Sequence, residues 1–143
     1  MSAKDEVRKA STRFYAALNR MLKGDVAPLA ECWSQSSAAT TMHPIGGRET
    51  GWKKVDASWQ QFAGLAGGGA VKLKGRQLQV AGSLAYESGI EHGHVVLGGE
   101  RAEIEHRVTN VYRREGKRWK IVYHHADASP AMIELLARLQ AKA

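Results

Sequence analysis

The sequence predicts an α+β fold in which N-terminal helices cover a strongly curved antiparallel sheet. Apolar residues recur every three or four positions across residues 4–23, the period of an amphipathic helix. From about residue 70 the pattern changes to four extended segments separated by glycine-containing turns, which predicts an antiparallel meander. With 143 residues, 43% of them hydrophobic, the chain has the size of a single domain, residues 1–143.

The first two predicted elements are helices. The long first helix occupies residues 4–23, with Tyr15 at the edge of its apolar face, where the hydroxyl could reach a cavity. Gly24 ends this helix, and Asp25 can cap a shorter one that reaches about Trp33.

A short strand, a loop and an aromatic helix are predicted next. Residues 37–44, SAATTMHP, favour a strand because threonine prefers extended backbone and Pro44 cannot continue a sheet. The segment IGGRET, residues 45–50, is predicted to be a loop. The helix that follows is indicated by apolar side chains spaced three or four residues apart, which are Trp52, Val55, Trp59 and Phe62. The glycines of residues 63–69 are predicted to end this helix and let the chain turn.

The sheet is predicted to contain one irregularity. Its apolar positions change parity near Gly75, from Val71 and Leu73 to Leu78 and Val80, which indicates a bulge or bend. A short C-terminal helix is predicted to begin at Pro130.

Composition narrows the class of protein. The net charge of +7 makes nucleic acid a partner to consider, but the basic residues are scattered among acids and form no recognised motif, so nucleic-acid binding ranks last. No apolar run is long enough to span a membrane, and the N-terminal residues do not resemble a secretory signal. The single cysteine, Cys32, fits a reducing compartment, and we expect a cytoplasmic protein.

Two segments carry a resemblance to a known family. The MHPIGGRETGW loop leading into the aromatic helix, and the closing RVTNVYRREGKRWKIVYHHADAS hairpin, resemble the nuclear transport factor 2-like (NTF2-like) superfamily. More narrowly, they resemble its SnoaL-like branch and the association domain of calcium/calmodulin-dependent protein kinase II. The resemblance implies a cone-shaped, cystatin-like fold around a cavity and a homodimer through the outer face of the sheet. It implies no particular reaction.

The closing hairpin contains the main candidate site residues. Because side chains alternate along a strand, His106, Asn110 and Tyr112 share one face, which we expect to face the cavity; a plain packed sheet face is the alternative. His124 and His125 must point in opposite directions, so the sequence predicts that one of them meets the cavity without deciding which.

These considerations give a set of candidate site residues. The predicted catalytic residues are His106, His124 and Tyr15. The predicted ligand-binding residues are Trp33, His43, Trp52, Trp59, Phe62, Asn110 and Tyr112, although the aromatic ones could equally fill the core. His92 and His94 could share a metal, but no complete ligand set is visible, so neither a metal nor a cofactor is expected.

The function predicted is binding of a small, partly apolar molecule. Arg48 and Arg107, expected near the cavity mouth, would favour an anionic guest. Proton transfer, isomerisation or elimination on that guest are the reactions considered, but residues 36–43, where the carboxylate base of the steroid isomerases of this superfamily is expected, contain no carboxylate. Whether the domain is an enzyme therefore stays open, and a non-catalytic association domain is the alternative.

Overall fold

The computed structural model describes residues 1–142 and contains one six-stranded sheet and four helices. The helices and strands are α1 (Ala3–Met21), α2 (Ala27–Cys32), β1 (Thr40–Met42), β2 (Glu49–Thr50), α3 (Trp52–Leu65), β3 (Ala66–Ala81), β4 (Leu84–Leu97), β5 (Glu100–Glu115), β6 (Arg118–Ala126) and α4 (Pro130–Ala141). Within residues 1–142, none of the helices has the length and apolar character needed to cross a bilayer.

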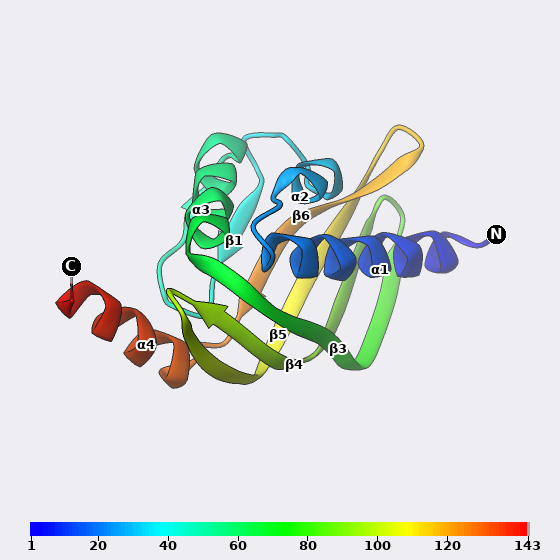
Figure 1. The fold of residues 1–143 in the computed structure, drawn as a ribbon. Coiled ribbons are helices and arrows are strands. Elements are labelled where there is room, and N and C mark those ends of the chain that lie inside the picture. The colour runs from blue at the N-terminus through cyan, green and yellow to red at the C-terminus, as the bar shows by residue number, and fades with distance from the viewer. Residues whose placement is uncertain (143) are drawn as a thin grey trace.

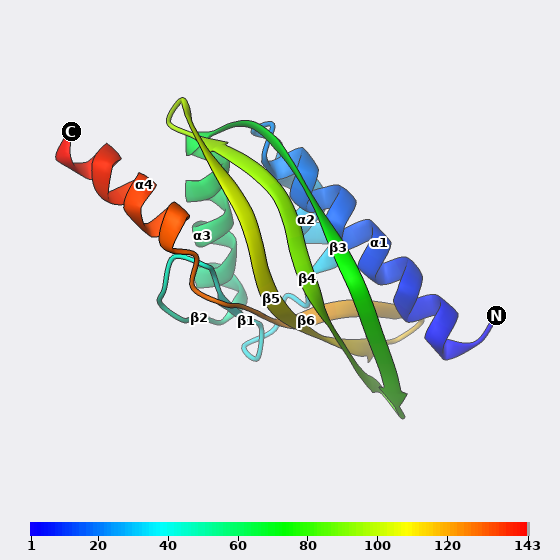
Figure 2. The same cartoon turned by 90° about the horizontal axis from the view of Figure 1, so that it is seen from below.

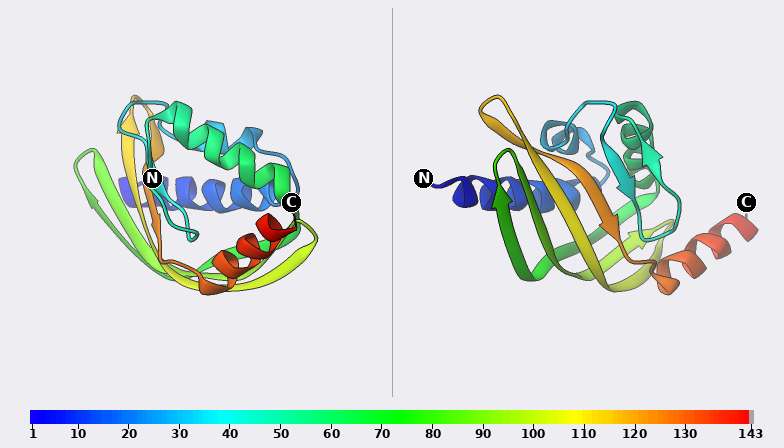
Figure 3. Two further views of the ribbon diagram at one scale, coloured as in Figure 1. Left: turned by 90° about the vertical axis from the view of Figure 1, so that its left-hand side faces the viewer. Right: turned by 180° about the vertical axis from the view of Figure 1, so that it is seen from behind.

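The strands follow the order β2-β1-β6-β5-β4-β3. The four long strands form the predicted antiparallel meander, whereas β1 pairs with β6 in parallel, so the sheet is mixed. The sheet is strongly bent, and α1 lies across its concave side beside α2 and α3 (Figures 1 and 2). The α+β prediction is confirmed. Figure 3 shows α4 placed at one end of the bent sheet, away from the N-terminus.

Helix α1 forms where its periodicity predicts. Its first turn carries a capping box, in which Ser2 Oγ accepts from the backbone N–H of Asp5 and the Asp5 carboxylate accepts from the N–H of Ser2. Helix α2 begins at Ala27 rather than directly after Asp25, but the Asp25 carboxylate still accepts a hydrogen bond from the backbone N–H of Ala27 at 3.3 Å.

Helix α3 ends within residues 63–69, as predicted, but the glycines that follow lie in a strand rather than in a separate turn. Strand β3 begins directly at Ala66, and Gly69 lies against the neighbouring strand. A Cβ on Gly69 would lie 2.4 Å from the carbonyl oxygen of His94, and one on Gly93 would lie 1.9 Å from that of Ala70. Glycine at these two positions therefore lets two backbones approach closely where the sheet bends, so the run serves the strand pair instead of a turn.

The predicted irregularity near Gly75 is confirmed. The register of β3 against β4 shifts between Lys74 and Gln77, and Gly75 has a positive φ of 64°. Both Val71 before the shift and Leu78 after it are buried, so the bulge explains the change of parity along the strand.

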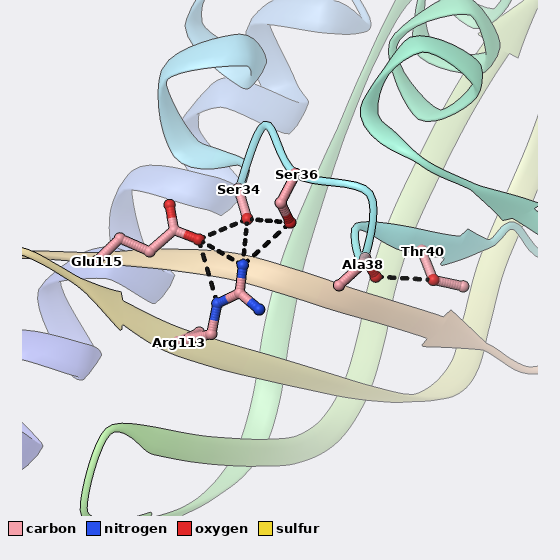
Figure 4. Close-up of polar contacts among 6 residues, drawn as sticks. All are labelled: Ser34, Ser36, Ala38, Thr40, Arg113 and Glu115. Atoms are coloured by element: carbon pink, nitrogen blue, oxygen red, sulfur yellow. Dashed lines mark hydrogen bonds and ion pairs between the residues drawn. The ribbon is translucent and has the colours of Figure 1, made fainter.

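A polar clamp holds the segment between α2 and β1 against the sheet. Arg113 on β5 donates from Nη2 to the hydroxyl oxygens of Ser34 and Ser36, and to the Glu115 carboxylate at 2.8 Å (Figure 4). Ser34 is fully buried and donates to Glu115 at 2.6 Å. The clamp fixes the chain that leads into β1, the strand directly before His43.

Candidate functional site

The inward face of β5 matches the predicted alternation. His106, Asn110 and Tyr112 are buried, whereas Arg107 and Thr109 between them are exposed. On β6, alternation requires the two histidines to face opposite sides of the sheet, and the structure shows which one faces inward. His124 is buried against the concave side of the sheet, and His125 is exposed on the outer face.

A cavity of about 50 Å³ lies between the concave side of the sheet and the helices. This volume holds a few water molecules or a very small organic molecule, and it is well below the roughly 300 to 1,000 Å³ of a drug-sized pocket. Its wall is mostly apolar and includes the flexible side chains of Met21 and Met132, which can adapt to a guest. Its polar or aromatic residues are His43, Trp59, Phe62, Glu91, His106 and His124.

Half of the predicted site residues line this cavity. They are His43, Trp59, Phe62, His106 and His124. The predicted ligand-binding residues Trp33 and Trp52 do not line it, because Trp33 is enclosed in the apolar core and Trp52 packs against the outside of that core.

The other three predicted site residues lie behind the cavity wall. Tyr15, Asn110 and Tyr112 are buried but do not line the open space. Each donates a hydrogen bond to one of two buried carboxylates on β4, Glu87 or Glu91. These three residues therefore orient the residues of the cavity wall instead of contacting a ligand directly.

Glu91 is the cavity residue that sequence reasoning missed. One carboxylate oxygen lies 2.7 Å from His106 Nε2, and the other accepts from the Tyr15 hydroxyl at 2.9 Å. The side chain is buried, with both oxygens bonded. A signal existed in the sequence, because Glu91 has the same parity along β4 as the buried Val95 and Leu97.

Glu87 anchors a second part of the network. Its Oε1 atom accepts from Ser11 and Asn110, each at 3.0 Å, and from Tyr112 at 2.6 Å. Arg76 Nε lies 3.3 Å from the other oxygen, close enough for ion pairing although its N–H does not point at that oxygen. Glu87 is fully buried, so these contacts compensate for the loss of hydration of its carboxylate.

Glu87 determines which nitrogen of His124 carries hydrogen. Asn110 must direct its Nδ2 group to the Glu87 carboxylate, which leaves its oxygen facing His124 Nδ1 at 2.6 Å. His124 Nδ1 is therefore the donor, and in the neutral ring Nε2 carries the lone pair. No described residue bonds to Nε2, which is open to the cavity.

His43 is oriented in a comparable way from the other side of the cavity. The Ser58 hydroxyl donates to the carbonyl of Val55 at 2.7 Å, so its oxygen accepts from His43 Nε2 at 2.8 Å. The lone pair of the neutral His43 ring therefore lies on Nδ1. The His43 ring packs edge-on against Trp59 and Phe62, with centroids 4.6 and 4.9 Å away.

Burial sets the charge states of these groups. It lowers the pKa of His43 to about 3, with a smaller contribution from His124, and it lowers the pKa of His124 below its usual value despite the nearby Glu91. Burial opposes ionisation of Glu91, but hydrogen bonds from His106 and Tyr15 and the nearby imidazoles outweigh it, so its pKa is lowered. Near neutral pH the wall thus contains an ionised Glu91 and neutral rings at His43 and His124.

The predicted cationic mouth is not part of this cavity. Arg107 lies on the outer face, is largely exposed and binds the Asp127 carboxylate at 2.6 Å. This hydrogen bond is the main cause of the lowered pKa of Asp127. Arg48 lies exposed in the loop before β2, and no lysine or arginine in residues 1–142 lines the cavity.

The paired histidines of β4 lie on the outer face of the sheet. His92 is opposite Glu105 and His94 is opposite Glu103 in the β4–β5 ladder. The described part of the chain contains no group of three or more histidine, cysteine, aspartate or glutamate side chains that could hold a metal ion.

The arrangement is suited to moving a proton in an apolar environment. His124 presents a basic nitrogen whose partner nitrogen is held as a donor by the Asn110–Glu87 pair. Glu91 and His106 form a second hydrogen-bonded acid–base pair on the same cavity. Groups of this kind can act as general bases or acids for a molecule bound between them.

Comparisons with known proteins agree with this architecture. The SnoaL-like domain family matches residues 7–132. A candidate dehydratase of the NTF2-like family from Streptomyces avermitilis is 25% identical, with a TM-score of 0.78 and coverage of 90% of this chain and 96% of that one. A candidate calcium/calmodulin-dependent protein kinase type II association domain from Thiobacillus denitrificans is 26% identical, with a TM-score of 0.70 and coverage of 85% and 94%.

A third similar structure supports the fold alone. An NTF2-like superfamily protein from Salmonella enterica is 20% identical, with a TM-score of 0.76 and coverage of 89% of this chain and 92% of that one. No curated protein matches the sequence significantly. The match of the family to most of the chain, on a bent sheet of the NTF2-like type, shows that this protein belongs to the family of SnoaL-like domains.

Proposed function

We propose that this SnoaL-like domain binds a small, partly apolar molecule in the cavity and transfers a proton to or from it. The observation that carries the proposal is the orientation of His124, whose Nδ1 is bonded to Asn110 while Nε2 is open to an apolar space. A neutral imidazole held in one tautomer is a suitable general base near neutral pH.

The Glu91–His106 pair lies on the same cavity wall and places a fixed carboxylate beside the bound molecule rather than exchanging a proton with it. His106 lies 2.7 Å from the carboxylate, which the Tyr15 hydroxyl holds from the other side. Tyr15 therefore acts as a positioning residue, and its own pKa is raised by burial and by Glu91. In an elimination, His124 Nε2 would take a proton from carbon and return it to the leaving hydroxyl as the C–O bond breaks, which releases water.

The comparison with the candidate dehydratase supports elimination as one reaction of this kind. Isomerisation needs the same first step, which is removal of a proton from a carbon next to a carbonyl. The base that the sequence lacks between α2 and β1 is replaced in this proposal by His124, which comes from β6.

Hydroxyacetone provides a direct test, because it is small and has an acidic C–H beside a carbonyl. We expect the protein to accelerate exchange of that proton for deuterium in D₂O, followed by proton NMR. His124→Asn retains a donor toward Asn110 but removes the basic nitrogen, so the catalysed rate should fall about 100-fold.

His125→Asn is the matched control, because it changes the neighbouring but exposed histidine and should leave the rate unchanged. An equal catalysed rate in the wild type and His124→Asn would reject His124 as the base. No saturable binding of hydroxyacetone, and no catalysed exchange, would reject the proposed function.

We also propose a homodimer through the outer face of the sheet, the role that an association domain would require. The 26% identity to the candidate kinase association domain supports it. So does a cross-strand row of Tyr86, Val111 and Tyr123, which lie in register on the outer face of β4, β5 and β6. Tyr86 is 50% exposed, so a partner could cover it.

A further inference from the structure

We propose that the cavity selects an uncharged molecule that donates hydrogen bonds, such as a small alcohol or a hydroxyketone, over an uncharged molecule that only accepts them, such as acetone, and over a carboxylate or an ammonium ion. This inference rests on the proposed function, because it names the class of molecule that the same cavity would bind. It follows from two histidines of the wall, each with one ring nitrogen whose lone pair no described residue uses.

The first lone pair belongs to His124. Its ring nitrogens are distinguished by the chain Glu87–Asn110–His124, in which each bond has only one chemically sensible direction. A carboxylate cannot donate, so Asn110 donates to Glu87 and accepts from His124. The remaining nitrogen, Nε2, can only accept a hydrogen bond while the ring is neutral.

The second lone pair belongs to His43, whose ring centroid lies 6.4 Å from that of His124. Ser58 already uses its hydrogen on the carbonyl of Val55, so His43 donates from Nε2 and retains its lone pair on Nδ1. No described residue bonds to Nδ1. Two acceptors thus belong to neighbouring rings on the wall of one cavity.

The wall offers no accessible donor to balance these acceptors. The Trp59 indole N–H has no partner in the described residues, but it is enclosed by protein and does not reach the open space. His106 donates from Nε2 to Glu91, and its Nδ1 is likewise enclosed. Both oxygens of Glu91 already accept hydrogen bonds, from Tyr15 and His106. A guest with only acceptor atoms would therefore face lone pairs with no hydrogen to share.

Charge excludes the two ionic alternatives. A carboxylate guest would be buried beside Glu91, with no lysine or arginine of the described chain on the wall. An ammonium guest would find the same two ring acceptors as an alcohol, but it would lose the hydration of a full charge to face one carboxylate whose oxygens are already bonded, which is costly. An alcohol has one hydrogen to donate, little desolvation cost and an apolar part that fits the aliphatic wall.

Four small molecules of similar size separate these classes, namely 2-propanol, acetone, acetate and isopropylammonium. Binding can be measured by titration of the protein's histidine and methyl resonances in NMR at pH 7. We expect 2-propanol to bind with a dissociation constant about tenfold lower than that of acetone, the value of one good hydrogen bond. Acetate and isopropylammonium should bind more weakly than the alcohol.

The variant His124→Asn removes the Nε2 acceptor and should reduce the preference of alcohol over ketone, whereas the exposed-site control His125→Asn should retain it. If acetone, acetate or isopropylammonium binds as tightly as 2-propanol, this inference is wrong although binding itself, and the proposed function, would stand. If none of the four binds and hydroxyacetone also fails, the small-molecule site itself is rejected, and this inference with it.

Discussion

The stability of this protein should fall between pH 7 and pH 5 because His43 is buried as a neutral ring. In the folded chain its pKa is about 3, against a usual value of 6.5. Burial is the main cause, since the ring is enclosed between Trp59 and Phe62, and the nearby His124 adds to the effect. In this pH range the unfolded chain binds a proton at His43 that the folded chain does not bind.

The size of the loss follows from these two pKa values. Because the unfolded state binds more protons between about pH 3 and 6.5, the free energy of unfolding decreases as the pH falls through that window. For one such group, the decrease between pH 7 and pH 5 is about 2 kcal/mol. Glu91 contributes little at pH 5, because its lowered pKa places its loss of stabilisation below its usual value of 4.5.

Urea unfolding at pH 7 and pH 5, followed by circular dichroism, tests this reasoning. His43→Gln replaces the titrating ring with an amide that can still donate to Ser58. Its free energy of unfolding should fall between the two pH values by about 2 kcal/mol less than that of the wild type. His125→Gln, at an exposed histidine, should follow the wild type. Equal losses in His43→Gln and the wild type would refute the assignment of a buried, neutral His43.

Two further predictions concern the clamp and the outer face. Arg113→Ala should lower the free energy of unfolding by about 2 kcal/mol in the same urea assay, because it removes the guanidinium that donates to both the buried Ser34 hydroxyl and Glu115. The control Arg118→Ala, at an exposed arginine, should change it by less than about 0.5 kcal/mol. Equal effects of the two substitutions would contradict the clamp. Tyr86→Lys places a charge on the proposed interface and should convert the dimer to a monomer in analytical ultracentrifugation. The control Lys53→Glu, on the exposed surface of α3, should leave the dimer intact. If the wild-type protein is itself a monomer, the proposed interface is rejected.

The parity of β5 was predictable because no bulge interrupts it up to Val111. Every second residue from Ala102 to Asn110 is buried, so a period of two identifies the inward face without coordinates. The pairing of β5 with β6 shifts between Val111 and Tyr112, and here Ile121 and Val122 are adjacent buried residues. Counting along β6 alone therefore could not decide between His124 and His125.

The hydrogen-bond partners of the two carboxylates could not be predicted in the same way, although the parity of β4 indicates that both face inward. The resemblance directed attention to the segment before β1, which has none, whereas the structure supplies Glu87 and Glu91 from β4. Their partners on α1, Ser11 and Tyr15, are each 76 residues away in the sequence. Such pairs depend on the packing of α1 across the sheet, and no local pattern records that packing.

The two buried carboxylates are more informative about function than about stability. Burying an ionised carboxylate is costly, and replacing a buried polar group and its partners with apolar side chains of similar volume is often neutral or stabilising. Beyond the histidines and Tyr15, the residues around Glu91 are aliphatic and aromatic, so an apolar core of similar volume could have formed there. Glu87 touches no open space, but through Asn110 it fixes the one histidine nitrogen that does. A costly group whose effect is to orient a basic atom in a cavity is what acid–base chemistry requires, and this favours a ligand-binding site over a vestigial interior.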